Sequence, residues 1–450
     1  MFEQNLKNAR VVITKKEAGG FQPIEEPLES LASLQQESRP ADRWSWRVML
    51  RNCSSFGTLL LLLVGAIPTR SLGQTQQQPK LVSSRPIPEP AVPAILAAFD
   101  KYEVVAMPAE HGIKDLDDFI FSLIRNPAFS ENVNDIAVEC GNSLYQPILD
   151  RYIAGDAVPF TEVRKVWRNT TQPVCGMSGF YDQFFPLVRA INQGLPAGRR
   201  LRVLACDPPV DWDQVNNFQD ILKLTHRDAN IASVMEKEVL SKHRKALMLF
   251  GTFHIMHGVG ASAVSIYEKD YPDRTFVISD LGYFDTDVRA LSSSPFVTWQ
   301  IPSLARTKDT SLGALPLDRF LPPPTLIDKD CKVHNDFPTQ LRKSMGQLVD
   351  ALLYLGPQDL RLKAQFSADI ALDVDYRMEL QRRESLPGFP GATSAAPKEI
   401  LKEVDQQIVN DAGNPLFAIP RSKTPNPADP ELSRAVQSCL DRKSNKSPTQ

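Results

Sequence analysis

The chain has 450 residues, of which 42% are hydrophobic and 23% charged, with a formal net charge of -2. This composition is typical of globular proteins and excludes a wholly disordered or collagen-like chain. The 51 basic and 53 acidic residues nearly balance, so we predict no nucleic-acid partner. Proline is abundant, with 36 residues against 22 glycines. Because proline lacks an N–H donor, its clusters indicate segments outside packed elements.

The N-terminal part of the sequence has the features of a targeting segment followed by a linker. Arg47 and Arg51 precede an apolar run at 56–67, which ends at small residues before Gln74. These features are typical of a secretory signal peptide, and the run is shorter than the roughly 20 residues that span a bilayer. We therefore predict a disordered or mis-annotated extension at 1–48, a signal peptide at 49–73 and a Pro/Gln-rich linker at 74–92.

This segment predicts an exported protein, periplasmic or extracellular, with no stable transmembrane span after signal cleavage. The alternative is an uncleaved helix that anchors the N-terminus in the membrane. Export permits disulfide bonds, but the odd number of cysteines after the signal peptide leaves their pairing open. Cys140 and Cys206 lie at the ends of predicted strands, where we expect buried free thiols.

Short apolar runs alternate with amphipathic segments between 93 and 290. The runs lie at 104–107, 135–138, 201–205, 246–250 and 275–278. Strands that are apolar on both faces and separated by helices indicate a parallel sheet covered on both sides. The sequence therefore predicts an α/β fold, a three-layer sandwich with a mostly parallel central sheet and helices on both faces.

In the C-terminal third, apolar runs and the breaks between them alternate less regularly. We predict that 291–386 extends the 93–290 core, with its clearest element at 345–355. The proline-rich segment 387–450 is predicted to be a flexible tail. The sequence leaves the oligomeric state open.

Polar side chains follow four of the predicted strands, at the edge where open α/β sheets bind ligands. These residues are acids and histidines, namely Glu110, His111, Glu139, Asp207, His254 and His257. A carboxylate at the end of a buried strand is costly without a partner, which favours a functional role for Glu139. The concentration of these side chains predicts a functional site at the carboxyl edge of the sheet.

Several of these residues also have a plain structural interpretation. Asp207 precedes two prolines, where an aspartate commonly caps a turn or a helix. Arg227, Asp228 and the stretch 167–170 either line the cleft or serve in helix capping and packing. We predict Asp207, Arg227 and His257 as the residues that bind a small-molecule substrate or ligand.

Three short motifs carry a resemblance to a known superfamily. They are MPAEHG at 107–112, DIAVE at 135–139 and LFGTFH at 249–254. Their order and their places at strand ends resemble the superfamily of erythromycin esterase-like proteins, ChaN-like haem-uptake proteins and Tiki-type proteases. The resemblance covers roughly residues 100–280. It implies a hydrolase or a haem-binding protein, with His111, Glu139 and His254 matching the superfamily's motif positions.

The first motif departs from the superfamily's pattern. Pro108-Ala109 stands where the superfamily has Gly-Glu, and the available glutamate is Glu110, directly beside His111. Neighbouring side chains on an extended strand point in opposite directions. Glu110 therefore replaces the superfamily's glutamate only if the backbone turns at this point.

The leading hypothesis is acid–base hydrolysis of an ester or amide-type bond. In it, His111 is the base, Glu139 orients it or acts as a second acid, and His254 polarises the substrate or binds the leaving group. Glu110 is a further catalytic candidate. A metal-assisted variant places one divalent ion on His111, Glu139 and His254. The alternative function is a non-catalytic envelope protein that binds haem or another hydrophobic ligand.

Overall fold

The computed structural model describes two parts of the chain, which form separate compact units, Met1–Gln77 and Gln78–Gln450. The described residues are 12–17, 20–25, 84–109, 112–224, 226–260, 262–280, 295–317, 326–327, 330–334, 341–357, 361–362, 364, 367, 370, 372–387, 436–437 and 440. In the first unit, β1 (Val12–Glu17) pairs antiparallel with β2 (Gly20–Glu25). The assignment of 1–48 to a disordered or mis-annotated extension stays a prediction. The predicted signal peptide, 49–73, lies outside the described residues.

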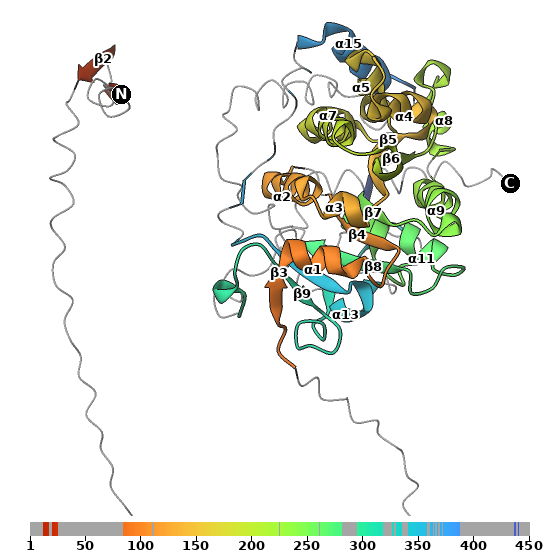
Figure 1. The fold of residues 1–450 in the computed structure, drawn as a ribbon. Coiled ribbons are helices and arrows are strands. Elements are labelled where there is room, and N and C mark those ends of the chain that lie inside the picture. The colour runs from red at the N-terminus through yellow and green to blue at the C-terminus, as the bar shows by residue number, and fades with distance from the viewer. Residues whose placement is uncertain are drawn as a thin grey trace, which may run out of the picture. The chain divides into compact units, whose positions relative to one another are not determined.

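The second unit is built on an eight-stranded sheet with the order β3-β9-β12-β8-β4-β7-β5-β6 (Figure 1). Pairing is parallel from β12 to β6, whereas β9 runs antiparallel to both β12 and β3. This confirms the predicted α/β fold with a mostly parallel sheet. The strands are β3 (Pro88–Pro90), β4 (Val104–Pro108), β5 (Asp135–Asn142), β6 (Arg202–Asp207), β7 (Ala246–Phe250), β8 (Thr275–Asp280), β9 (Ser303–Arg306) and β12 (Ala351–Tyr354).

Helices cover both faces of this sheet, and each face has its own hydrophobic core. One core contains residues of α1 (Ala91–Ala98), α2 (Lys114–Arg125), α3 (Phe129–Asn132), α4 (Gln146–Ala154), α5 (Phe160–Arg168), α6 (Pro173–Met177) and α7 (Gly179–Gln193). The other contains residues of α9 (Arg227–Glu238), α10 (Thr252–Ile255), α11 (Ala263–Tyr267) and α13 (Met345–Leu348). The molecule is therefore the expected three-layer sandwich.

The pleat of the strands explains how one short apolar run serves both cores. Along β4, Val105 and Met107 belong to the core under α2, whereas Val104 and Ala106 belong to the core under α9. Alternate side chains of a strand point to opposite faces, so a strand buried on both sides must be apolar throughout. This property made the central strands readable from the sequence.

Shorter elements complete the described chain. They are α8 (Phe218–Leu222), α15 (Val374–Glu384), β10 (Leu326–Ile327), β11 (Val333–His334) and the 3-10 turns η4 (Ser143–Tyr145), η5 (Ala197–Arg199), η6 (Trp212–Gln214), η7 (Leu240–Lys242) and η8 (Pro295–Thr298). Within the described ranges, we find no helix both long enough and apolar enough to cross a membrane.

The structure places ordered elements in two of the segments that flank the predicted core. The last residues of the predicted linker 74–92 are ordered, because β3 joins the sheet and α1 begins at Ala91. Proline is tolerated there since β3 is an edge strand. The segment 291–386 contributes β9, β12, α13 and α15, so it completes the same sheet. Nearly all of the predicted tail 387–450 lies outside the described residues.

The predicted state of one cysteine is wrong. Cys140, on β5, forms a disulfide with Cys175 on α6, with a Cα–Cα distance of 5.3 Å. The two residues are 35 positions apart, and only the packing of α6 against β5 brings them together. Cys206 is a buried free thiol, as expected. Burial raises the pKa of this thiol, so it stays protonated.

Candidate functional site

The candidate site lies at the carboxyl edge of the sheet and is centred on Glu139. The register of β5 against β6 shifts between Val138 and Asn142, so Glu139 sits in an irregular part of the strand. Such irregularities re-aim side chains beside functional sites. One carboxylate oxygen of Glu139 accepts from Arg227 Nη2 at 3.0 Å, and the other accepts from the backbone N–H of Gly251 at 2.7 Å. Both oxygens of this almost fully buried carboxylate thus have a hydrogen-bond donor, and the position of Glu139 is fixed.

Arg227 joins Glu139 to a second buried carboxylate. Its Nε donates to Asp207 Oδ1 at 2.7 Å, and Asp207 also accepts from the backbone N–H and the hydroxyl of Thr171. Burial raises the pKa of Asp207, while Arg227 and Thr171 oppose this shift. Burial also disfavours the charged guanidinium, but Asp207 and Glu139 outweigh this effect and raise the pKa of Arg227. The Arg227 cluster, defined as Arg227, Glu139, Asp207 and Thr171, thus pairs one buried guanidinium with two buried carboxylates.

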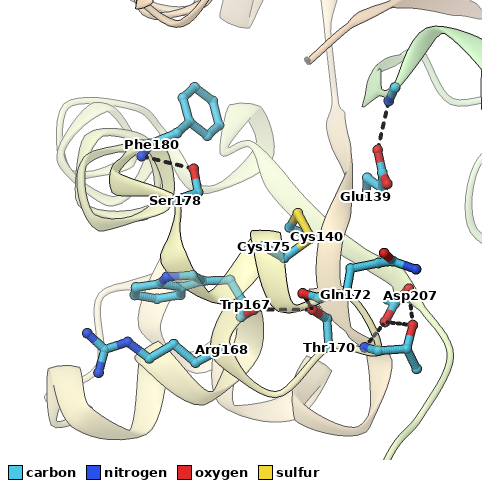
Figure 2. The surroundings of a disulfide bond; sticks show 12 residues. Glu139, Cys140, Trp167, Arg168, Thr170, Gln172, Cys175, Ser178, Phe180 and Asp207 are labelled. Atoms are coloured by element: carbon cyan, nitrogen blue, oxygen red, sulfur yellow. Dashed lines mark hydrogen bonds between the residues drawn. A yellow bond between two sulfur atoms is a disulfide. The ribbon is translucent and has the colours of Figure 1, made fainter. Parts of the chain in front are cut away.

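Figure 2 shows Glu139 next to the disulfide of Cys140, with Asp207 and Thr170 gathered further along the same edge. The bond to Cys175 ties the end of β5 to α6 directly beyond Glu139. The turn before α6 contains Thr171, which holds Asp207. The segment from Thr171 to Cys175 is therefore tied to both carboxylate-bearing strand ends, to β5 by the disulfide and to β6 by hydrogen bonds.

His254 stands beside the Arg227 cluster. It lies on the short helix α10, which begins directly after β7 and Gly251. Its Nδ1 is 2.9 Å from Asp228 Oδ1, and its Nε2 is 3.5 Å from Glu139 Oε1. Burial lowers the pKa of His254, but the Asp228 hydrogen bond and the charge of Glu139 outweigh burial and raise it. The ring therefore holds a proton more strongly than a free imidazole.

Asp228 is a site residue that the sequence placed only in a general cleft-lining group. It lies in the first turn of α9, directly after Arg227, and its Oδ1 also accepts from the backbone N–H of Ala263. Two adjacent residues on α9 thus hold different parts of the site. Arg227 binds Glu139 and Asp207, and Asp228 binds His254. The sequence shows the charged pair Arg227-Asp228 at the start of a predicted helix. The spacing of residues along the chain does not indicate which side chains this pair contacts.

Two predicted catalytic residues, Glu110 and His111, lie outside the described residues. Of the described residues on either side of them, Ala109 donates to the backbone oxygen of Phe250, and Gly112 accepts from the backbone N–H of Ala364. Gly112 has a φ of 87°, a conformation that favours glycine and marks a turn of the backbone after His111. Whether Glu110 occupies the position of the superfamily's glutamate stays a prediction.

His257 does not join this site. Its Nδ1 is 2.9 Å from Glu268 Oε1, and its Nε2 is 2.9 Å from Asp350 Oδ2. Asp350 also accepts from the backbone N–H of Val277 on β8. Burial lowers the pKa of His257, but the two carboxylates raise it to about 9. Both ring nitrogens of His257 are therefore engaged within the fold, and its ligand-binding role stays a prediction.

The described donors fit neither a divalent metal nor haem. Both oxygens of Glu139 accept from Arg227 and Gly251, so a guanidinium stands where a metal ion would compete. The rings of His254 and His257 each face two carboxylates. Carboxylate oxygens engage Nδ1 of His254 and both ring nitrogens of His257, so these nitrogens are not available to iron or zinc. Among the residues that the structure describes, no three potential ligands gather as a metal site.

No protein-family model and no curated protein matches the chain. Solved structures that resemble it include the following three. A protein from Bacillus cereus and an erythromycin esterase variant in its open conformation each show 10% identity and a TM-score of 0.37, covering 60% of this chain and 94% of theirs. A haem-bound ChaN of Campylobacter jejuni shows 14% identity and a TM-score of 0.26, covering 42% and 84%. Because these TM-scores are low, function has to be derived from the side chains of this chain.

Proposed function

We propose that the protein is a hydrolase that cleaves an ester or amide-type bond of a small molecule by general acid–base catalysis. The observation that carries this proposal is the position of His254 between two carboxylates, Asp228 and Glu139. A histidine oriented through Nδ1, with its other nitrogen directed to the strand-end site, is suited to proton transfer. Its raised pKa favours the protonated ring, which is the form of an acid.

In this proposal His254 donates the Nε2 proton to the leaving group. His111 removes a proton from water, the water oxygen bonds to the acyl carbon, and the bond to the leaving oxygen or nitrogen breaks. The proton from His254 completes the leaving group. The role of His111, with Glu110 as an accessory acid, rests on the motif resemblance alone.

Glu139 is a positioning residue in this scheme. Its oxygens are occupied by Arg227 and Gly251, so it orients His254 and stabilises the charged ring. Arg227 and Asp207 bind each other and Glu139. We therefore propose that they hold Glu139 in place, in contrast to the substrate-binding role that the sequence predicted for them.

The test is an activity screen of the purified full-length chain on ester and amide substrates, beginning with p-nitrophenyl acetate. We expect His254→Ala and His111→Ala each to lower kcat about 100-fold or more. Glu139→Gln keeps the shape but removes the charge beside His254, and should lower kcat about tenfold. The matched control is His226→Ala, because His226 is an exposed histidine at the start of α9.

Two further arms separate the alternatives. Turnover that appears only with added zinc, manganese or iron would favour the metal-assisted variant. No turnover together with a saturable Soret shift on haem titration would replace the hydrolase proposal with ligand binding. Equal activity of the wild type and all variants would remove the proposed roles altogether.

We also propose that the protein is exported, through the signal peptide at 49–73. The Cys140–Cys175 disulfide supports this localisation, because disulfides persist in oxidising compartments. N-terminal sequencing of the protein recovered from the cell envelope is the test. A mature N-terminus near Gln74 is expected, whereas an intact N-terminus would indicate the uncleaved anchor.

A further inference from the structure

A cavity lies away from the Arg227 cluster, between α5, η6 and α15. Its volume is about 310 Å³, and its lining includes Arg168, Trp212, Tyr376 and Arg383. This volume is at the lower end of the roughly 300–1,000 Å³ of small-molecule sites. None of Glu139, Asp207, Arg227 and His254 lines it. In Figure 2 Arg168 extends away from Asp207, which places it on the other side of the turn that ends at Thr171.

Arg168 forms the buried floor of this cavity and has one unsatisfied edge. Its side chain is 5% exposed, and Nη1 donates to Asp373 Oδ2 at 2.6 Å. Its Nε and Nη2 are buried and have no hydrogen-bond partner. These two nitrogens form one side of the planar guanidinium, and this edge matches the two oxygens of a carboxylate.

The neighbouring side chains fix the guanidinium in this position. Its carbon lies 4.5 Å from the centroid of the Tyr376 ring, and the hydroxyl of Tyr376 donates to the backbone oxygen of Arg168. Arg383 donates to the same oxygen and stacks on Trp212 at 4.2 Å. Two aromatic rings and two guanidinium groups therefore make a rigid inner wall. Both nitrogens are buried, so we infer that a carboxylate reaches this edge when the side chains around it change rotamer.

The outer part of the cavity, its rim, carries charges of both signs, because Arg164 and Lys165 line it together with several carboxylates. Asp211, Asp213 and Asp375 line it, are exposed, and form no salt bridge with any other described residue. Asp373 and Glu379, which also line the cavity, are already paired with Arg168 and Arg383. A molecule with both an anionic and a cationic end complements the floor and the rim together.

We propose that this cavity binds a small zwitterion, an α-amino acid or a short peptide, with its carboxylate on the Nε–Nη2 edge of Arg168 and its ammonium group at the rim formed by Asp211, Asp213 and Asp375. This binding site is separate from the Arg227 cluster and His254. Its occupation does not depend on the proposed hydrolase activity.

The test is calorimetric titration of the full-length protein with L-leucine, L-alanyl-L-alanine, acetate and methylamine. We expect saturable binding of at least one zwitterion, at least tenfold tighter than either single-charge probe. Arg168→Lys keeps the charge but loses the two-nitrogen edge, so it should weaken zwitterion binding at least tenfold. Binding of acetate equal to that of both zwitterions, or an unchanged affinity of Arg168→Lys, would overturn the proposal.

A rim variant decides the matter if Arg168→Lys does not fold. The double substitution Asp213→Asn with Asp375→Asn changes only exposed side chains. It should weaken zwitterion binding about tenfold and strengthen acetate binding. Zwitterion affinity that is the same in this variant and the wild type, or no zwitterion binding by the wild type at all, would contradict the assignment. Lys237→Gln, an exposed charge on α9 outside the cavity, is the matched control.

Discussion

His254 and His257 lie only three positions apart and have similar partners, but their rings are held differently. Each ring lies between two carboxylates, and each side chain is about a fifth exposed, at 21% and 22%. Both nitrogens of His257 are 2.9 Å from carboxylate oxygens, whereas His254 has one contact of 2.9 Å and one of 3.5 Å. Asp350, a partner of His257, is also bound to the backbone of β8.

The difference shows how the same side-chain types serve a site or a scaffold. The bonds of His257 join three elements, because Glu268 follows α11, Asp350 precedes β12 and Val277 lies on β8. His254 is held firmly only from α9, and its second nitrogen faces the strand-end site. Losing His257 should therefore affect folding, and losing His254 should affect chemistry.

The largest expected effect is on turnover by the His254→Ala variant. We expect kcat to fall about 100-fold or more, because the proposed acid is removed. The melting temperature should change by only a few degrees, since one nitrogen of the ring makes a hydrogen bond. Steady-state kinetics and calorimetry on the same preparation check both parts. Near-normal turnover with a large loss of stability would reverse the assignment of the two histidines.

The second effect is on the stability of the His257→Ala variant. Removing this ring leaves Glu268 and Asp350 unpaired in a partly buried position, which should cost about 3 kcal/mol of unfolding free energy. Denaturant unfolding measures this change, while kcat should stay near the wild-type value. His243→Ala is the control, because His243 is 76% exposed and pairs with a single carboxylate. That variant should lose about 0.5 kcal/mol or less.

The third effect is a dependence of stability on pH that His257 causes. Its pKa is raised from 6.5 to about 9 in the folded protein. The stabilisation is therefore complete below the unfolded value and is lost as pH rises through about 9. We expect a loss of about 2 kcal/mol between pH 6.5 and 10, allowing for partial exposure. Unfolding curves across this range test it, and the same loss in His257→Ala would assign it to other groups.

The smallest expected effect is that of Asp228→Asn on the proposed acid. An amide still contacts Nδ1 of His254 but no longer stabilises its positive charge. We expect kcat/KM to fall about tenfold, and the alkaline limb of the pH–rate profile to move to lower pH. An alkaline limb at the wild-type position would show that the titrating group is not His254.

The central strands were predictable because their burial on both faces requires continuous apolar runs, as at 104–107 and 246–250. The strand ends then placed Glu139, Asp207 and His254 at one edge, and the structure places the three around Arg227 and Asp228. This part of the site depends on topology, which the alternation of strands and helices reveals.

Other contacts depend on packing over long distances. The Cys140–Cys175 bond and the pairing of Arg168 with Asp373 join residues that no periodicity relates. The different contacts of His254 and His257 depend on where the chain turns after β7. His257 is drawn toward Asp350, more than ninety positions along the chain, and its spacing from the strand could not indicate this.

The prolines of β3 have a consequence for the behaviour of the folded protein at high concentration. An edge strand normally exposes a row of N–H and C=O groups on which another chain can add a strand and begin to aggregate. β3 is the edge of the eight-stranded sheet, and Pro88 and Pro90, at its two ends, have no N–H to offer. The same residues that made the composition unusual thus block edge-to-edge association on this side of the molecule.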